Sequence, residues 1–309
     1  MATMGWNEAE LLRWLARRPR PARVRGSWGH DAAVLHGLRG DPVVCADQVV
    51  EGVHAERGTS GRHLGRKAAG RALSDLAATG AEPVALLLCL AAPRSEGAAR
   101  LRAVITAVDA KGREHGAPLV GGDLAGTRGA LRLAVTALGR FPARRRPPGR
   151  DRARPGDLVL LSGPTGGSRR GRHLDPRPRL ELGRCLAAHG VHALMDVSDG
   201  LALDLARLAR ASGVRIDLER VPVHRDALLL TGGDARRARR RALDDGEDHE
   251  LLATLPRAAW AVLERRLRRR FAGLEVVGRV RRGHGLWLAT EDGGRLAPWS
   301  GAGGFVHGA

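Results

Sequence analysis

A stretch rich in proline and arginine interrupts the chain near its middle and separates two halves of similar character. Residues 140–155 (RFPARRRPPGRDRARP) contain four prolines and almost no apolar side chains. Proline lacks a backbone N–H and restricts its own backbone, so such a run rarely lies inside a helix or a strand. The chain has 309 residues, the length of about two domains. We therefore predict one domain at 1–140, a linker at 141–155 and a second domain at 156–309.

Both halves mix the patterns of strands and helices. Short apolar runs bounded by turn residues are typical of buried strands, and apolar residues three or four apart are typical of helices. In the first half they predict strands at 42–52, 84–91, 118–123 (ending in a turn) and 130–139, and helices at 64–79 and 95–115. In the second half they predict strands at 157–163, 193–197, 213–219, 251–256, 274–280 and 285–290, and helices at 179–189, 201–211 and 257–270. Each half is thus expected to be α/β or α+β.

Several classes of protein are disfavoured by simple features of the sequence. The longest apolar run, at 84–92, falls short of the roughly 18–20 residues that a membrane-spanning helix needs. The first residues lack the apolar segment of a secretory signal, so we expect none there. The cysteines Cys45, Cys89 and Cys185 are scattered, without the paired spacing of a zinc site or a disulfide framework. Scattered cysteines fit the reducing cytoplasm, where we expect the protein to reside.

The charge of the chain is strongly positive. There are 52 lysines and arginines against 33 acidic residues, a formal net charge of +19, which favours a polyanionic partner. A protein that binds nucleic acid specifically would add aromatic side chains among its basic residues. Aromatic residues make up only 3% of this chain, and arginine is spread along its whole length. We interpret the excess as a compositional bias and expect no specific nucleic-acid partner.

Six aspartates stand in apolar or glycine-rich segments, where a charge is costly unless it is paired, caps a helix or binds a cation. They are Asp31, Asp47, Asp75, Asp123, Asp196 and Asp199. Taken singly, each has an ordinary structural explanation. Any of them could pair with an arginine, Asp199 could cap the helix that follows it, and Asp123 could be a turn residue.

As a set, these aspartates favour a different interpretation. Several lie at predicted strand ends or beside glycines, where ligand sites tend to form. Carboxylate oxygens without histidine or cysteine clusters suit Mg²⁺, which keeps phosphate oxygens among its ligands. The sequence therefore predicts a site for Mg²⁺ and a nucleotide. The chain contains no GxxxxGK[ST] motif, so it is not a P-loop enzyme.

The order of these segments resembles the thiamine-monophosphate kinase family of the PurM-like superfamily. The matching segments are GHDAAVL (29–35), ADQVVEGVH (46–54), RALSDLAATGAEP (71–83), GGD (121–123), VTALG (135–139), MDVSDGL (195–201) and DGEDHELL (245–252). A weaker match, GGFVHG, lies at 303–308. The resemblance implies a two-domain PurM-like fold. Its N-terminal domain has a mixed sheet that contributes to a dimer barrel, and its C-terminal domain is α+β.

The resemblance also implies a site, with ATP as co-substrate and several Mg²⁺ ions held between the two domains. The implied metal ligands are Asp31, Asp47, Asp75, Asp123, Asp196 and Asp199. The positions implied to bind ATP are Gly122, Asp123, Arg150 and Ser198, and those implied to contact thiamine phosphate are His54, Glu247 and Phe305. Among them, Asp75, Asp123 and Arg150 are implied to be catalytic. A homodimer is implied as well.

The chain departs from the family pattern at several positions. His30 stands where the family has an aspartate, and Cys45 and Ala46 replace a pair of hydroxyl residues. His249 replaces a tyrosine, and Ala55 replaces a phenylalanine. These changes leave the implied nucleotide site in place and alter the surroundings of the implied substrate.

The implied reaction is phosphorylation of thiamine phosphate by ATP to give thiamine diphosphate. The acceptor phosphate is largely ionised at neutral pH, because its second pKa is about 6, so no general base is needed. One alternative is another PurM-like ATP-dependent enzyme, such as aminoimidazole ribonucleotide synthetase, selenophosphate synthetase or the hydrogenase-maturation protein. A second alternative is a diverged ATP-binding protein without kinase activity, and the weakest is a nucleic-acid-binding protein.

Overall fold

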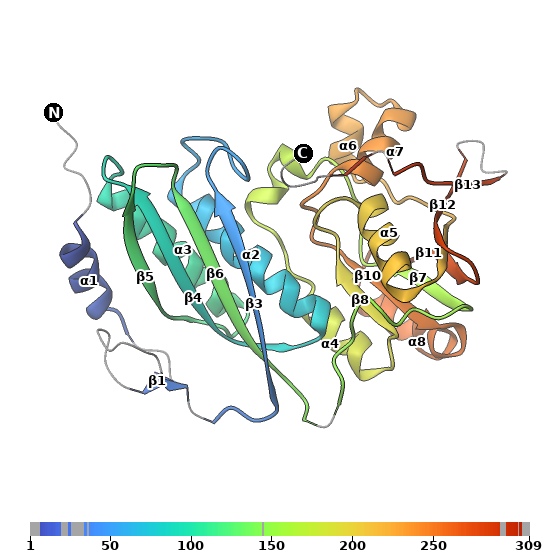
Figure 1. Cartoon of the computed structure of the whole chain (residues 1–309), viewed down its shortest axis with the longest axis horizontal. Helices are drawn as coiled ribbons and strands as arrows, with labels where there is room; N and C mark the ends of the chain where they lie inside the picture. Colours follow the sequence, from blue (N-terminus) through green and yellow to red (C-terminus); the bar gives the residue numbers. More distant parts are fainter. Residues whose placement is uncertain are drawn as a thin grey trace. The chain divides into compact units, whose positions relative to one another are not determined.

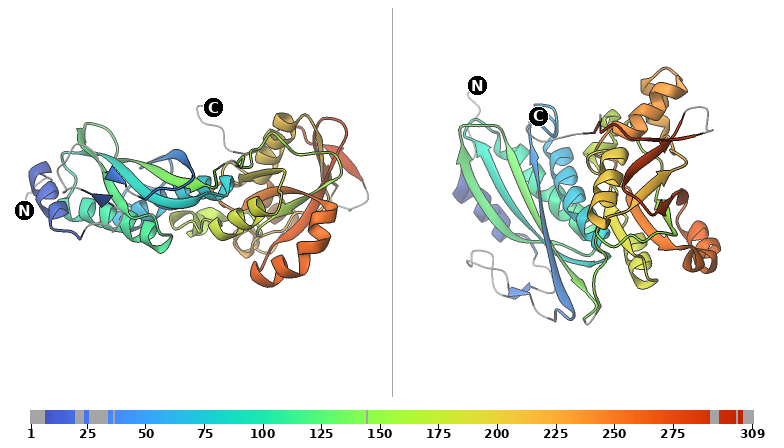
Figure 2. Two further views of the ribbon diagram at one scale, coloured as in Figure 1. Left: turned by 90° about the horizontal axis from the view of Figure 1, so that it is seen from below. Right: turned by 45° about the vertical axis from the view of Figure 1, so that its right-hand side comes forward.

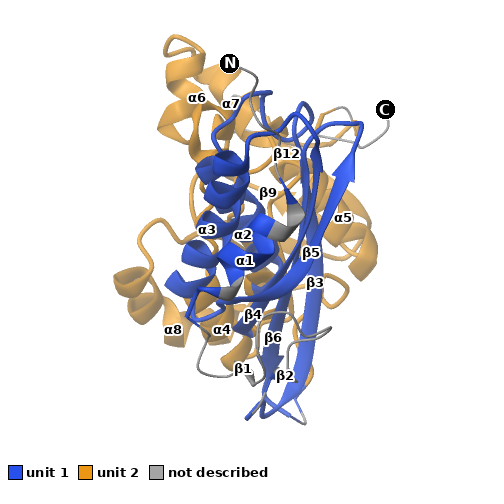
Figure 3. Ribbon diagram, turned by 90° about the vertical axis from the view of Figure 1, so that its left-hand side faces the viewer, with its two compact units in different colours: residues 1–76, 82–145 blue, residues 77–81, 146–309 orange. Residues whose placement is uncertain are grey.

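The computed structural model describes residues 7–19, 24–25, 34–35, 37–143, 145–290, 295–301 and 303–304. It divides into two compact units, coloured separately in Figure 3. Unit 1 comprises Met1–Leu76 and Glu82–Arg145, and unit 2 comprises Ala77–Ala81 and Arg146–Ala309. None of the described helices has the length and apolar character needed to cross a membrane.

Unit 1 is built on a four-stranded mixed sheet with helices (Figure 1). Its elements are α1 (Glu8–Ala16), β1 (Val24–Arg25), β2 (Val34–Leu35), β3 (Asp41–Val50), α2 (Gly61–Thr79), β4 (Glu82–Pro93), α3 (Ala98–Glu114), β5 (Leu119–Thr127) and β6 (Arg132–Phe141). The order in the main sheet is β3-β6-β4-β5, with β4 and β5 parallel and the other pairs antiparallel. The mixed sheet expected in the first half is thus confirmed.

In the described part of unit 1, Leu35 and Leu38 pack over part of one sheet face, beside Ala85 and Leu138, and helices cover the other face. The helices α2 and α3 lie on this face, as the left view of Figure 2 shows, where Leu86, Leu88 and Val135 are buried. The alternate residues point the other way. On that open face Val44 is 63% exposed and Leu87 is 40% exposed. Strands with one solvated face normally carry polar residues there, so this apolar exposure is unusual.

The strand predicted at 118–123 does not end in a turn at Gly122 and Asp123. Instead β5 continues to Thr127, paired in parallel with β4. Gly122 makes this possible, because a Cβ there would lie only 1.8 Å from the carbonyl oxygen of Leu88. Gly122 therefore permits the close approach of β4 and β5. Because Asp123 lies within β5, its interpretation as a turn residue is wrong.

Unit 2 is built on a seven-stranded sheet among the described residues (Figure 1). Its elements are β7 (Asp157–Leu161), two short 3₁₀ helices (Ser168–Arg170 and Arg172–Leu174), α4 (Leu180–Ala188), β8 (Ala193–Asp196), α5 (Leu201–Ser212), β9 (Arg215–Leu218), α6 (Arg225–Leu230), α7 (Ala235–Asp244), β10 (Leu251–Pro256), α8 (Arg257–Arg270), β11 (Glu275–Arg281), β12 (Gly285–Ala289) and β13 (Leu296–Pro298). The strand order is β13-β12-β9-β11-β7-β10-β8, and only β9 and β12 are parallel neighbours.

Helices cover both faces of the unit 2 sheet. The apolar side of α5, with Leu201, Leu205 and Leu208, packs on one face in a single buried cluster. The helix α8 contacts β7 and β10 and buries Trp260 and Leu263. The central strands are therefore buried on both sides, which is why β7 and β10 are continuous apolar runs in the sequence.

Candidate active site

The loop that joins β8 to α5 is held by a buried aspartate from the first turn of α5. The Asp204 side chain is fully buried, and its Oδ2 accepts hydrogen bonds from the backbone N–H groups of Ser198 and Asp199, each at 3.0 Å. Gly200 follows at φ +119°, a conformation that favours glycine. The side chains of Ser198 and Asp199 are thus presented from a fixed backbone at the carboxyl end of β8.

One arginine joins two carboxylates of this loop. Arg207 Nη1 donates to Asp199 and, at 3.0 Å, to Asp204 Oδ1. Burial raises the pKa of Asp204 to about 6, and the nearby charges of Asp199 and Asp196 add to that rise. The three carboxylates are therefore close enough to affect one another. Asp199 does not cap α5, because the residue before the helix is Gly200 and makes no side-chain cap.

The segment 245–250 pairs with this loop along its backbone. The N–H of Glu247 donates to Ser198 O at 2.7 Å, and the N–H of His249 donates to Val197 O at 2.8 Å. Glu247 and His249 both have positive φ, which is uncommon for residues other than glycine. Unit 2 thus brings the predicted residues Asp196, Ser198, Asp199 and Glu247 together at one edge of its sheet.

His249 occupies a buried position next to Asp196. Its Nδ1 lies 3.2 Å from Asp196 Oδ2, and the residue is only 2% exposed. Its Nε2 is buried without a hydrogen-bond partner in the described part of the chain. The histidine that replaces the family's tyrosine therefore contacts an implied metal ligand directly.

Two further acidic residues anchor the segment 245–250 to the rest of unit 2. Asp248 Oδ2 accepts from the N–H of Gly166 at 2.8 Å, and its Oδ1 accepts from Arg172 Nη2 at 3.0 Å. Glu250 accepts from Arg179 Nε at 2.8 Å. Burial raises the pKa of Asp248 to about 7, although the Arg172 charge and the Gly166 N–H oppose the rise.

The raised pKa of Asp248 predicts how stability depends on pH. The ordinary pKa of an aspartate is 3.8, and the pKa of Asp248 in the folded chain is about 7. Between pH 3.8 and about pH 7 the folded state therefore holds more protons than the unfolded state. The free energy of unfolding should therefore fall as pH rises through this window, by about 1.4 kcal/mol for each unit of difference. In Asp248→Asn the fall should be smaller. Urea unfolding at pH 4.5 and 7.5 measures the difference, and equal pH dependence in both proteins would contradict it.

The predicted residue Arg150 lies apart from this loop within unit 2. Its carbonyl accepts from Ser212 Oγ at the end of α5, and the preceding Gly149 bridges to Ala193 at the start of β8. The helix α5 has 12 residues, which corresponds to about 18 Å. Unit 2 by itself therefore does not bring Arg150 to Ser198.

In unit 1, Asp47 is paired with an arginine from α2. Arg71 donates to both carboxylate oxygens of Asp47, from Nε at 2.8 Å and from Nη2 at 2.9 Å. Asp75 follows one turn later on α2 and is half-buried. Asp47 and Asp75 thus both belong to the side of the sheet that α2 covers. The arginine explanation offered for single aspartates is confirmed for Asp47 and Asp199.

Asp123 lies elsewhere in unit 1. In the strand pairing Asp47 is opposite Val135, Val135 is opposite Leu88, and Leu88 is opposite Gly122. Asp47 and Gly122 are therefore separated by three strand spacings of about 4.8 Å. Asp123 is exposed on the outer strand β5, opposite Cys89 on the open face. Unit 1 thus keeps Asp123 three strands away from Asp47.

His54 lies in a loop that is fixed by its own hydrogen bonds. The backbone N–H of Val50 donates to His54 Nδ1 at 3.1 Å, so a neutral imidazole carries its proton on Nε2. Glu51 accepts from Arg100 and, at 2.8 Å, from the N–H of Gly58. These hydrogen bonds thus fix the loop that carries His54. The predicted residues Asp31 and Phe305 lie outside the described residues.

The predicted carboxylates have the donor atoms that a hard cation prefers, but they do not form a preassembled metal-binding cluster. Throughout the described ranges, no three histidine, cysteine, aspartate or glutamate side chains are placed to hold a metal ion. The donors are carboxylate oxygens, which suit Mg²⁺. Each carboxylate has about four lone-pair directions, so an arginine does not use up its capacity.

Comparison with known proteins identifies the family. Models of the N-terminal and C-terminal domains of AIR synthase related proteins match residues 29–141 and 154–285. A thiamine-monophosphate kinase of Rhodopirellula baltica is 34% identical, over 97% of this chain and 97% of its own length. The chain belongs to the thiamine-monophosphate kinase family.

Solved structures of the thiamine-monophosphate kinase family share the fold. The crystal structure of the enzyme from Stenotrophomonas maltophilia has a TM-score of 0.77 and 32% identity, covering 89% of this chain and 93% of that chain. The structure of AaThiL complexed with AMPPCP and TMP has a TM-score of 0.74 and 28% identity, covering 86% and 87%. The two-domain PurM-like fold expected from the resemblance is confirmed.

Sequence reasoning missed two residues that organise the site of this thiamine-monophosphate kinase family member. Asp204 stands in LALDLARL, an apolar helical segment, and so satisfies the criterion that selected the other aspartates. Arg207 follows three residues later, on the same side of the helix. The signal was therefore present in the sequence, as an i, i+3 pair on the buried face of α5.

Proposed function

We propose that the chain transfers the γ-phosphoryl group of ATP to the terminal phosphate of thiamine phosphate, giving ADP and thiamine diphosphate. A phosphate oxygen of the acceptor forms the new P–O bond while the bond to the ADP oxygen breaks. The observation that carries this proposal is the match over almost the whole length to a thiamine-monophosphate kinase. AaThiL, bound to the ATP analogue AMPPCP and to TMP, supports it further.

The barrier to this reaction comes from bringing two anions together in line. We propose that Asp31, Asp47, Asp75, Asp123, Asp196 and Asp199 hold Mg²⁺ ions, and that Gly122, Asp123, Arg150 and Ser198 contact ATP. When bound, Mg²⁺ would neutralise charge on the reacting phosphates. Asp204 fixes the backbone that carries Ser198 and Asp199, so the site is preorganised before ATP arrives. Thiamine phosphate would lie against His54, Glu247 and Phe305.

A direct assay tests the reaction. Purified protein with MgATP should release ADP only when thiamine phosphate is added, and thiamine diphosphate should appear in equal amount. Release of ADP without thiamine phosphate would show transfer to water and would contradict the proposed transfer to thiamine phosphate. Binding of ATP without release of ADP in either condition would favour one of the two alternatives, another PurM-like enzyme with a different acceptor or a diverged ATP-binding protein.

Replacement of His54 by alanine should weaken the binding of thiamine phosphate more than the binding of ATP. The Nε2–H donor is held in place by Val50, so His54→Ala loses one hydrogen bond to a charged phosphate, worth about 1.5–3 kcal/mol. We expect the KM for thiamine phosphate to rise roughly 10-fold or more, with the KM for ATP little changed. His63→Ala, an exposed histidine at the start of α2, serves as control. Equal rises in both KM values would contradict a substrate contact.

We also propose that the chain forms a homodimer through the open face of the unit 1 sheet. Val44 and Leu87 are exposed there, and apolar faces of this kind mark protein–protein contacts. Leu87→Glu should convert a dimer to a monomer in light scattering. Val262→Glu, on α8 where the side chain is 82% exposed, should not. A wild-type monomer at micromolar concentration would contradict the proposal.

We also propose that this enzyme is located in the cytoplasm.

A further inference from the structure

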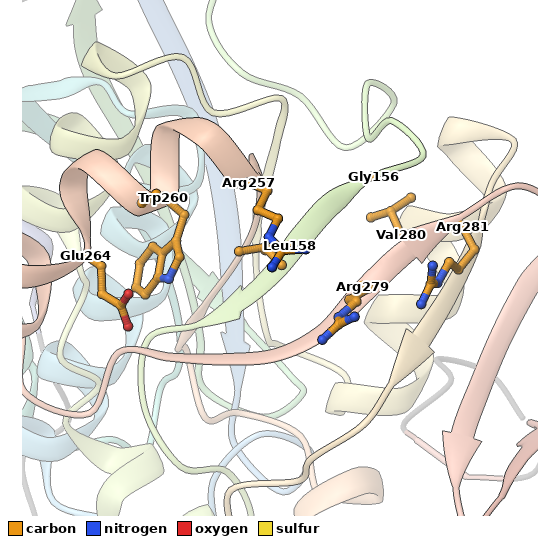
Figure 4. A pocket seen from close by; sticks show the side chains of 9 residues that line it. Gly156, Leu158, Arg257, Trp260, Glu264, Arg279, Val280 and Arg281 are labelled. Carbon is orange, nitrogen blue, oxygen red and sulfur yellow. The ribbon is translucent and has the colours of Figure 1, made fainter.

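A hollow beside α8 in unit 2 is lined by three arginines. It measures about 410 Å³, within the range of small-molecule sites. Arg257 is the first residue of α8, and Arg279 and Arg281 are alternate residues of β11, so both project from the same side of that strand. Figure 4 shows these side chains around the hollow, with Trp260 and Glu264 at its other end. The arginines thus converge from two elements.

The hollow exists because α8 covers only part of this face of the sheet. The helix contacts β10 and β7. The neighbouring strand β11 pairs with β7, with Arg279 opposite Leu158. Beyond the edge of α8, the outward side of β11 is therefore covered by its own arginine side chains rather than by a helix.

The charges around the hollow do not balance. Arg279 pairs with Glu219 at 3.4 Å, and Arg281 pairs with Asp217 at 3.6 Å. Two further ion pairs join the same groups, Arg215 with Asp217 and Arg268 with Glu264. Arg257 has no ion-pair partner among the described residues. Five arginines thus face three carboxylates, which leaves two positive charges, the charge that a phosphate dianion would neutralise.

The helix terminus and the walls add to this character. The residue before α8 is Pro256, which makes no side-chain cap, and the first turn holds no acidic residue. Uncapped N–H groups at a helix start favour an anion. Trp260 and Leu158 supply an apolar wall beside the arginines. The hollow therefore combines an anionic subsite with room for a small apolar group.

The hollow is separate from the loop that carries Ser198 and Asp199. β7 and β8 each pair antiparallel with β10, so they run in the same direction. Gly156 and Leu158 line the hollow at the start of β7, whereas Ser198 and Asp199 follow the end of β8. The two sites thus lie at opposite ends of these strands.

We propose that this hollow is a second ligand site, which binds a small organic phosphomonoester by its phosphate on Arg257, Arg279 and Arg281. The apolar part of the ligand would lie against Trp260. This site goes beyond the proposed kinase reaction and does not depend on it.

Calorimetric titration of the full chain with phenyl phosphate tests the site. Saturable binding is expected, with inorganic phosphate weaker and phenol without effect. Arg257→Ala should lower the affinity for phenyl phosphate about tenfold or more, because one charge-assisted hydrogen bond is lost. Arg266→Ala, an exposed arginine on the same helix with the same change in charge, should leave binding within about twofold.

Two further measurements separate this site from the proposed substrate site. His54→Ala should bind phenyl phosphate at the hollow as the wild type does, and Arg257→Ala should keep the wild-type rate of ADP release. Absence of saturable binding would overturn the proposal. Equal weakening in Arg257→Ala and Arg266→Ala would also overturn it, since general charge attraction would then account for the binding.

Discussion

Replacement of Asp75 by asparagine is expected to lower turnover by roughly two to three orders of magnitude while the fold stays intact. Asparagine keeps the shape of the side chain and removes the charge. Removal of a metal ligand's charge reduces the stabilisation of the transition state of phosphoryl transfer by several kcal/mol. A change of about 1.4 kcal/mol in the activation free energy corresponds to a factor of ten in rate. Asp75 lies half-buried on α2, one turn after the arginine that holds Asp47.

The measurement is kcat at saturating MgATP, together with thermal unfolding. Asp234→Asn is the matched control, because Asp234 caps α7 at an exposed position and asparagine caps about as well. The control should change neither quantity. Turnover within threefold of wild type in Asp75→Asn would remove this residue from the proposed metal site.

Replacement of Asp204 by alanine should damage both stability and turnover. The backbone N–H groups of Ser198 and Asp199 would lose their acceptor, and unsatisfied buried groups cost about 1–3 kcal/mol. The loop would then no longer hold Ser198 and Asp199 in place. Loss of such a supporting residue typically lowers activity by about 10- to 100-fold.

Comparison with variants of α5 separates the two effects. Arg207→Ala removes the counter-charge but leaves the acceptor for the loop, so its turnover should fall less than that of Asp204→Ala. Arg210→Ala, exposed on the same helix, should have no effect. Urea unfolding and kcat report the two quantities. Wild-type turnover in Asp204→Ala, whatever its stability, would show that the loop needs no support from α5.

Local patterns predicted most of the fold. The helix at 257–270 coincides with α8, and the apolar runs at 84–91 and 157–163 correspond to β4 and β7. The arginine-rich segment 236–242 lies in α7. These elements could be predicted because neighbouring residues determine both their periodicity and their ends.

The sequence was less informative where distant backbone decides the structure. β5 continues beyond Asp123 to Thr127 because β4 pairs with it, and no local pattern predicts this extension. The short helix α6 (Arg225–Leu230) has too few residues for a helical period to appear. Pairing and packing, rather than propensity, produce both elements.

The candidate site divides in the same way. Asp196, Ser198 and Asp199 are neighbours in sequence, and the structure keeps them together. The choice of arginine partner could not be predicted, because Asp47 pairs with Arg71, 24 residues away, in a chain with 52 basic residues. The contact between His249 and Asp196 spans 53 residues and appears only when the strands β8 and β10 are paired.

We propose that carboxylates of the predicted site residues bind divalent ions together with the nucleotide. A crystal structure with Mn²⁺ in place of Mg²⁺, AMPPCP and thiamine phosphate tests it most directly through the anomalous signal of the metal. We expect Mn²⁺ peaks at about 2.0–2.2 Å from carboxylate oxygens of Asp75, Asp123 and Asp199, with the triphosphate beside them. A nucleotide bound elsewhere, with no anomalous peak at these residues and Asp199 still on Arg207, would contradict the claim.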